Sequence, residues 1–161
     1  MYAAPPDTSQ ESRLKTALIY KLTKFVTWPE RSAGMAPMFV LCVMGGEEMH
    51  DALQVLENRQ VNNRSIRLLF LDSAEQEMEQ CQLVYFSRNG RARIATYLGR
   101  LRDSATLTVG DAEGFAGDGG MVEITQHGRR LGFDINLSSA KRSGLSLAAP
   151  LLDLANIVEA P

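Results

Sequence analysis

The amino-acid sequence predicts an α/β fold in which helices flank both faces of a mixed central β-sheet within a single domain. Strand-like and helical segments alternate along the first two thirds of the chain, which is typical of layered α/β domains. Residues 38–44 are apolar at every position, so we expect a strand buried on both faces, as in the interior of a parallel or mixed sheet. Residues 121–125 and 131–135 flank a turn near His127 and Gly128, which predicts an antiparallel hairpin.

The N-terminal part is expected to be a tail followed by a helix. Residues 1–8 show no periodic pattern, so we expect them to be disordered and the domain to span residues 9–161. Ser9, or alternatively Ser12, is a suitable helix cap, and Pro29 ends the helix. The apolar stripe predicted for this helix comprises Leu14, Leu18, Leu22 and Phe25.

The remaining elements follow from apolar periodicity and from turn residues. Further helices are expected at about residues 47–57, 89–102, 138–143 and 151–158. Further strands are expected over residues 65–71, 81–86 and 106–109.

Composition limits the classes of function. The chain has 161 residues, 45% hydrophobic and 22% charged, which is ordinary for one globular domain. Its net charge of -2 argues against a nucleic-acid-binding protein, because such proteins are usually basic. No apolar run reaches the roughly 18 residues that a membrane span needs. No signal peptide is recognisable, and a mature secreted chain would lack one as well.

The sequence does not assemble the residues of a catalytic or metal site. Ser146 sits in a segment that resembles a nucleophile elbow, but the second glycine is missing and both histidines precede it. His50 and His127 are isolated, which disfavours a metal site. The glycine-rich segment 114–120 matches no nucleotide-binding fingerprint, so we interpret it as a tight connection rather than a phosphate cradle. We therefore expect no enzyme activity, no cofactor and no metal.

Binding residues are easier to nominate. Asp134 and Asn136 end a predicted strand, and Arg142 lies in the next segment. Asp134 and Arg142 either form a structural ion pair or hold a polar ligand together with Asn136. Trp28 either belongs to the core or lines a pocket or interface.

The arginine-rich segment 88–102 is either a solvated helix face or a patch that docks an anion or a partner.

Cys42 and Cys81 each lie in a predicted apolar strand segment. They are either two buried thiols or one disulfide between neighbouring strands, and composition does not decide between these alternatives.

Several motifs together resemble the YfiR family over about residues 10–158. The first is Lys24-Phe25-Val26-Thr27-Trp28-Pro29 after an apolar helix, and the second is Leu107-Thr108-Val109-Gly110-Asp111 before Gly114-Phe115-Ala116. The others are Gly119-Gly120-Met121-Val122-Glu123-Ile124, and Phe133-Asp134-Ile135-Asn136-Leu137 leading to Gly144-Leu145 and Leu151-Leu152-Asp153-Leu154-Ala155. Their order and spacing make the set more specific than any single motif.

The resemblance implies a periplasmic, non-catalytic regulator. It implies binding to the periplasmic sensory domain of a membrane diguanylate cyclase similar to YfiN, which lowers cyclic di-GMP and biofilm formation. It also implies an outer-membrane lipoprotein similar to YfiB as a second partner, and a homodimer. An alternative role is a small-ligand-binding periplasmic sensor module.

The resemblance implies site residues as well. Cys42 and Cys81 match one disulfide pair of the family, whereas a second family pair has no counterpart between residues 114 and 123. Asp134 replaces the glutamate that family members more often carry near a small-molecule site.

Overall fold

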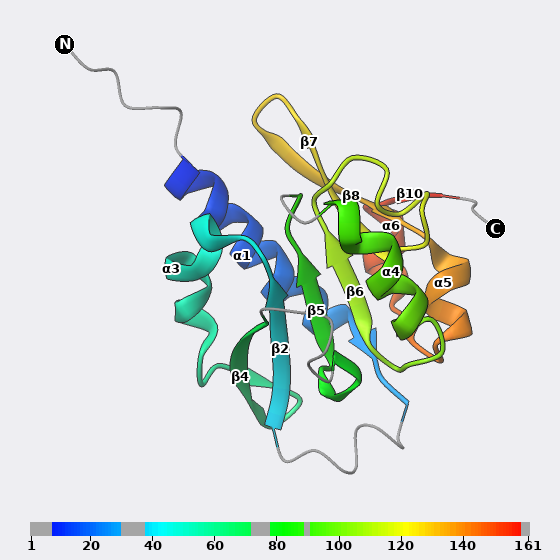
Figure 1. Ribbon diagram of the computed structural model, residues 1–161, viewed down its shortest axis with the longest axis horizontal. Helices are drawn as coiled ribbons and strands as arrows, with labels where there is room; N and C mark the ends of the chain where they lie inside the picture. The colour runs from blue at the N-terminus through cyan, green and yellow to red at the C-terminus, as the bar shows by residue number, and fades with distance from the viewer. Residues whose placement is uncertain (1–7, 30–37, 72–77, 89–90, 159–161) are drawn as a thin grey trace.

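The computed structural model describes residues 8–29, 38–71, 78–88 and 91–158, so residues 1–7 of the predicted tail lie outside the described part, and Thr8 already belongs to a helix. The helices are α1 (Thr8–Phe25), α3 (His50–Leu53), α4 (Arg91–Leu101), α5 (Leu137–Arg142) and α6 (Ala149–Asp153), with 3₁₀ turns η1 (Glu47–Met49), η2 (Gln54–Leu56) and η3 (Met78–Gln80). The strands are β1 (Val26–Thr27), β2 (Met38–Met44), β3 (Gln60–Val61), β4 (Arg64–Leu71), β5 (Leu83–Phe86), β6 (Leu107–Gly110), β7 (Val122–His127), β8 (Arg130–Ile135), β9 (Ser146–Leu147) and β10 (Asn156–Ile157) (Figure 1).

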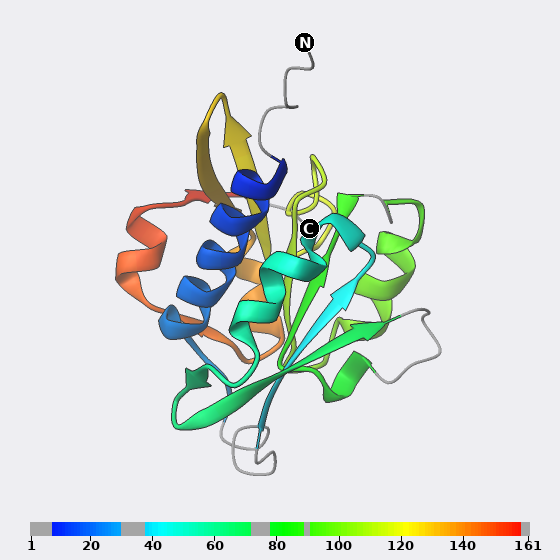
Figure 2. The same cartoon turned by 90° about the vertical axis from the view of Figure 1, so that its left-hand side faces the viewer.

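Eight strands form one sheet in the order β10-β8-β7-β6-β5-β2-β4-β3. The central strands β4, β2, β5, β6 and β7 pair in parallel, and β10 also runs parallel to β8. The pairs β7–β8 and β3–β4 are antiparallel. The predicted mixed sheet and the predicted hairpin are therefore confirmed, and the hairpin projects from the body of the molecule (Figure 2).

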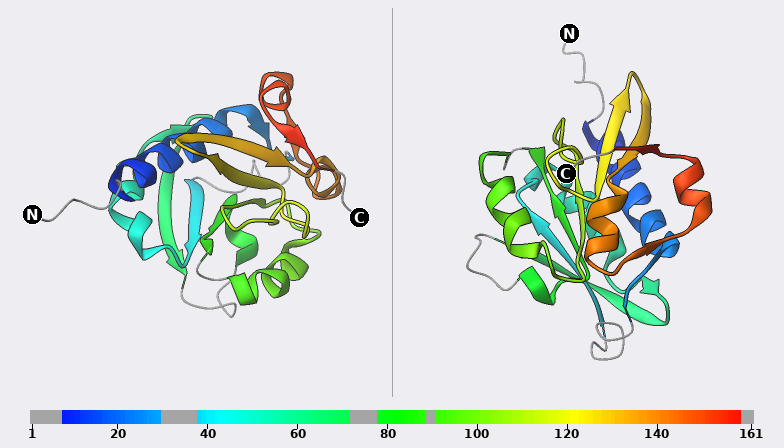
Figure 3. Two further views of the ribbon diagram at one scale, coloured as in Figure 1. Left: turned by 90° about the horizontal axis from the view of Figure 1, so that it is seen from above. Right: turned by 90° about the vertical axis from the view of Figure 1, so that its right-hand side faces the viewer.

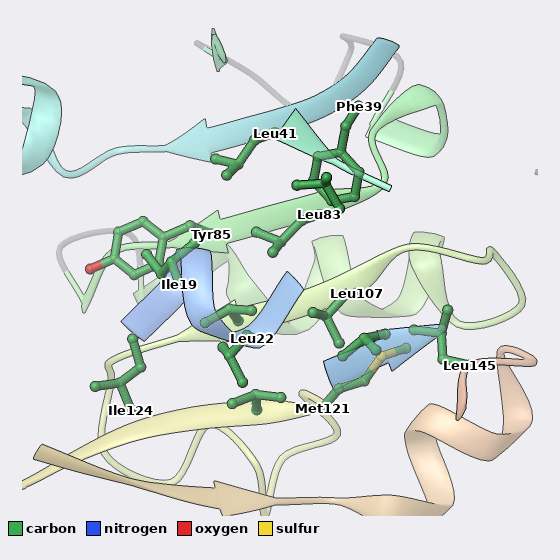
Figure 4. Packing of buried hydrophobic residues seen from close by; sticks show 14 of the residues in the cluster. Ile19, Leu22, Phe39, Leu41, Leu83, Tyr85, Leu107, Met121, Ile124 and Leu145 are labelled. Carbon is green, nitrogen blue, oxygen red and sulfur yellow. The ribbon is translucent and has the colours of Figure 1, made fainter. Parts of the chain in front are cut away.

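Helices cover both faces of this sheet, as predicted (Figure 3). On the face of α1, a cluster of buried apolar side chains joins the helix to the central strands (Figure 4). That cluster includes Ile19, Leu22, Leu41, Leu83 and Leu107. On the other face, α4 packs on the sheet through a second cluster that includes Ile94, Tyr97 and Leu101.

Strand β2 shows why the two faces have separate clusters. Leu41 and Val43 belong to the cluster under α1, whereas Cys42 and Met44 belong to the cluster under α4. The continuous apolar run is therefore explained by burial on both sides, as predicted for an interior strand.

A disulfide joins Cys42 of β2 to Cys81, which precedes the neighbouring strand β5. Their Cα atoms lie 5.9 Å apart, within the usual range for a disulfide. Both residues are buried in the cluster under α4. The bond thus fastens two central parallel strands on one face of the sheet.

Helix α1 departs from the prediction in its start and in its buried face. It begins at Thr8, so position 9 lies within the helix rather than before its first residue. Leu14 is 45% exposed, whereas Lys15 is buried. Of the predicted stripe, Leu22 is buried and Leu18 and Phe25 pack against the same cluster, so Leu14 is the residue that departs from the prediction. Lys15 points instead toward a carboxylate at the sheet edge, described below.

The C-terminal helix is shorter than predicted. Helix α6 ends at Asp153, and Asn156 and Ile157 instead form β10 beside β8. The Val158 amide continues this pairing by donating to the carbonyl of Ile135 at 2.8 Å. Sheet pairing at an open edge therefore overrides the local apolar pattern that favoured a helix.

The order in which the chain adds strands to the sheet reverses at the carboxyl ends of β2 and β5. Strand β4 is added on one side of β2, and β5 and β6 are added on the other side. The connection after β2 runs along the face of α1, whereas the connection after β5 forms α4 on the opposite face (Figure 1, Figure 3). In open α/β sheets, ligands bind outside the carboxyl ends of strands at such a point.

Candidate functional site

Trp28 is part of the core and has a defined structural role. It is 8% exposed, and its indole nitrogen donates a hydrogen bond to the carbonyl of Gln82 at 2.8 Å. Its ring meets Phe39 edge-on with centroids 5.1 Å apart. A small hollow of about 150 Å³ lies beside it. Trp28 is therefore a core residue that also lines this small hollow.

Asn136 is fully buried and caps α5. Its side-chain oxygen accepts from the Ser139 amide at 3.1 Å, and its side-chain nitrogen donates to the Ala116 carbonyl at 2.9 Å. The residue therefore ties the glycine-rich loop to the start of α5. Both ends of its amide are occupied by the protein itself, so Asn136 positions the loop rather than meeting a ligand.

Asp134 lines the largest hollow described here, which we call the open pocket. It measures about 840 Å³ and lies between the hairpin, α1 and the loops after β5 and β6. Asp134 stands directly across from Glu123 of β7 and accepts a hydrogen bond from the Asn156 side chain at 3.2 Å. The charged residues that line the pocket are Lys15, Arg88, Asp111, Glu113, Glu123 and Asp134.

Arg142 lies in a different hollow, which we call the α4–α5 cleft. This cleft measures about 320 Å³ and lies between α4, α5 and the glycine-rich loop. Among the described residues, Arg142 forms no ion pair with Asp134.

The four nominated binding residues are therefore not brought together. Asp134 lines the open pocket, Arg142 the α4–α5 cleft and Trp28 a third hollow, while Asn136 is enclosed. The predicted grouping of Asp134, Asn136 and Arg142 is not formed. The reason is that α5 begins directly after β8 and carries Arg142 away from Asp134.

The floor of the open pocket contains a network that the sequence did not reveal. Asp111, which follows β6, accepts from the Lys15 ammonium at 2.8 Å and from the Tyr85 hydroxyl at 2.6 Å. Its other oxygen accepts from the backbone amide of Arg88 at 2.8 Å. Lys15 also contacts Glu11 at 3.1 Å, one turn earlier on α1. The network fastens α1 to the carboxyl ends of β5 and β6.

The network also fixes the protonation of Tyr85. Burial, reinforced by the negative charge and the hydrogen bond of Asp111, raises the pKa of the Tyr85 phenol far above its ordinary value. Tyr85 therefore remains a neutral donor to Asp111 at physiological pH.

The glycine-rich loop is a packed connection, as the sequence indicated. A side-chain carbon on Gly110 or Gly120 would lie 2.7 or 2.1 Å from the Phe115 ring. The Glu123 carboxylate accepts from the amides of Gly114 and Ala116 at 3.3 and 3.0 Å. These contacts hold the loop that separates the open pocket from the α4–α5 cleft.

Among the described residues, no group of three or more histidine, cysteine, aspartate or glutamate side chains is arranged to hold a metal ion. None of the helices in this part of the chain is long and apolar enough to cross a membrane.

Comparison with known proteins identifies the family. A family profile described as YfiR/HmsC-like matches residues 12–156, which is most of the chain. The chain therefore belongs to the YfiR/HmsC-like family, as the sequence motifs indicated. No curated protein is similar enough to the chain to count as a match.

Proposed function

We propose that this protein is a periplasmic regulator that represses a membrane-bound diguanylate cyclase by binding its periplasmic sensory domain. The observation that carries the proposal is the YfiR/HmsC-like match over residues 12–156, because it supports a regulator of diguanylate cyclase signalling rather than an enzyme. Repression lowers cyclic di-GMP and hence biofilm formation.

The disulfide supports the proposed compartment. Disulfides persist in oxidising compartments such as the bacterial periplasm and are rare in the cytosol. The Cys42–Cys81 bond lies within the apolar cluster under α4, where it acts as a structural crosslink.

Repression by binding sets an energetic requirement. A regulator shifts a two-state enzyme only by its difference in affinity for the two states. Moving the cyclase from 1:99 to 99:1 in favour of the inactive state requires a preference of about 10⁴-fold, or about 5.5 kcal/mol. A few well-packed interface side chains supply free energies of this size.

The proposal includes two further assemblies that the family resemblance supports. The chain forms a homodimer, and an outer-membrane lipoprotein similar to YfiB releases the cyclase by sequestering the repressor. Light scattering of the purified protein gives the mass of the assembly, and a monomer at all concentrations would exclude the homodimer.

A genetic experiment tests the proposed repression in cells. The gene is deleted, and the strain is complemented either with a secreted copy or with an identical copy that lacks an export signal. We expect cyclic di-GMP to rise on deletion and to fall again only with the secreted copy. An unchanged level in a strain that expresses the cognate cyclase would contradict the function, and rescue by the unsecreted copy would contradict the compartment.

The interface can be mapped from the large apolar side chains that the described residues expose. These side chains are spread over the fold: Leu14 lies on α1, Val55 on η2, Leu69 on β4, Leu154 directly after α6 and Ile157 on β10. Each is replaced by aspartate, and binding to the purified sensory domain is measured. A variant that melts normally but binds at least tenfold more weakly marks the interface, and the variants that bind normally serve as matched controls.

A second candidate function is small-ligand sensing in the open pocket. Its volume of about 840 Å³ and the position of Asp134 on its wall favour this role. Asp134→Asn is compared with Asp153→Asn, which changes an exposed carboxylate on α6. If the pocket is a sensor site, a metabolite panel should bind the control but not the Asp134 variant. Equal binding to both proteins excludes the pocket.

A further inference from the structure

The α4–α5 cleft is separate from the open pocket and has the opposite electrostatic character. The glycine-rich loop lies between helices α4 and α5 (Figure 3). The cleft is lined by Leu98, Arg102, Thr108, Asp118, Ser139 and Arg142, among others. Its charged lining consists of two guanidinium groups and one carboxylate, whereas acids outnumber the basic residues in the open pocket.

The two arginines are available to a ligand. Arg102 and Arg142 are both exposed, and among the described residues neither guanidinium has an ion pair or a hydrogen bond. By contrast, Arg88 at the open pocket already contacts Glu11 at 3.5 Å. Guanidinium groups bind carboxylates and phosphates through paired, charge-assisted hydrogen bonds.

A buried hydroxyl in the same cleft lacks a partner. Ser139 is 4% exposed, and its hydroxyl oxygen makes no hydrogen bond in the described part of the chain. Its backbone amide is already used by the Asn136 cap. Buried polar groups are nearly always hydrogen-bonded, and Ser139 lines the cleft, so a rotation of its side chain toward the cleft would give the enclosed hydroxyl a partner there.

We propose that the α4–α5 cleft binds a small ligand through an oxyanion group, either a carboxylate or a phosphate. Arg102 and Arg142 supply the positive charge, and Ser139 donates a hydrogen bond to the same group. Asp118 is the one carboxylate in the lining, and its negative charge disfavours ligands that carry several negative charges. The proposal does not depend on the identity of the protein partner.

The test is a titration of the isotopically labelled full chain with two probes, sodium phosphate and sodium succinate. Ionic strength is held constant with sodium chloride, and backbone amide resonances are followed. We expect saturable shifts at residues of α4 and α5 for one probe, which identifies phosphate or carboxylate as the preferred group. An absence of saturable shifts with both probes, or shifts spread evenly over all exposed arginines, overturns the proposal.

Matched variants assign the binding to named groups. Arg102→Gln and Arg142→Gln should each weaken binding by about tenfold or more, whereas Arg93→Gln, an exposed residue of α4 outside the cleft lining, should leave it unchanged. An unchanged dissociation constant in Arg142→Gln overturns the proposal.

Ser139→Ala separates a binding role from a structural one. Because the hydroxyl has no protein partner, its removal should leave the melting temperature unchanged or raised, yet weaken binding about fivefold. Thr16→Val removes the other unpaired buried hydroxyl among the described residues, on α1, and should not change binding. Equal binding by Ser139→Ala and the unsubstituted protein removes Ser139 from the site.

Discussion

Replacing Asp111 with alanine tests whether the network under the open pocket stabilises the fold. The carboxylate is 3% exposed and accepts from Lys15, Tyr85 and the Arg88 amide at 2.8, 2.6 and 2.8 Å. Its loss leaves an ammonium group, a phenol and a backbone amide without their shared acceptor. Removing one partner of a buried ion pair typically costs about 3–5 kcal/mol.

The expected cost lies at the lower end of that range. Lys15 keeps its contact with the Glu11 carboxylate at 3.1 Å, so part of the positive charge on Lys15 remains compensated. The Glu11 side chain is 29% exposed, so this remaining ion pair is close to solvent. Water can also enter from the open pocket. We therefore expect Asp111→Ala to lower the free energy of unfolding by about 3 kcal/mol. Lys15→Met should cost less, about 1–2 kcal/mol, because Asp111 retains two hydrogen-bond donors.

Urea unfolding followed by circular dichroism measures these changes. With a urea dependence of about 2 kcal/mol per molar, the Asp111→Ala midpoint should fall by about 1.5 M. Asp153→Ala on the exposed face of α6 is the matched control and should change stability by no more than about 0.5 kcal/mol. The reasoning is refuted if Asp111→Ala behaves like this control, or if Lys15→Met is the more damaging change.

Three further changes probe other parts of the structure. The Cys42–Cys81 bond joins residues with a sequence separation of 39, so its reduction should lower the free energy of unfolding by about 4 kcal/mol. Thiol titration of denatured, unreduced protein should find no free thiol. Two titratable thiols in exported protein would contradict the crosslink. The pKa of Tyr85 is raised in the folded protein, so this group stabilises the fold fully below the unfolded-state pKa of about 10, and that stability is lost as pH rises beyond about 10. Tyr85→Phe should flatten this pH dependence in pH-jump unfolding. An equally steep loss of stability in the variant would contradict the assignment. Asn136→Ala removes a helix cap and leaves the Ala116 carbonyl unpaired, so thermal and urea unfolding should show a loss of about 2–4 kcal/mol, and an unchanged melt would exclude this role.

The fold was predictable where local pattern and tertiary burial agree. The all-apolar run of β2 requires cover on both faces, and the alternation around the hairpin turn requires one buried face, so both were recognisable from sequence. The helix predicted over 151–158 failed because backbone pairing of Asn156 and Ile157 with β8 is a long-range interaction that leaves no local signal.

The candidate site was less predictable because its residues are distant in sequence. Lys15, Tyr85 and Asp111 meet only after α1 crosses the carboxyl ends of β5 and β6. Nothing in the helical periodicity distinguishes buried Lys15 from exposed Leu14, since the apolar stripe alone favours the opposite assignment. An acid directly after a buried strand was the available signal for Asp111, because strand ends in α/β sheets converge at one edge.

Nearness in sequence was misleading for the predicted acid–base cluster. Asp134 and Arg142 are eight positions apart, but a strand end and a short helix direct them to separate hollows. Asn136 caps α5 and so starts this helix directly after β8, which sets the separation between Asp134 and Arg142.

Repression of cyclic di-GMP synthesis is tested most directly with the purified cognate cyclase reconstituted in lipid nanodiscs. Conversion of GTP to cyclic di-GMP is measured while this protein is titrated onto the complete enzyme, with a cyclase that lacks its periplasmic domain as the control. The account predicts that turnover of the complete enzyme falls to a few per cent at saturating protein, as the shift from 1:99 to 99:1 requires, while the truncated enzyme is unaffected. Unchanged turnover at a concentration that saturates binding, or equal inhibition of the truncated enzyme, would contradict it.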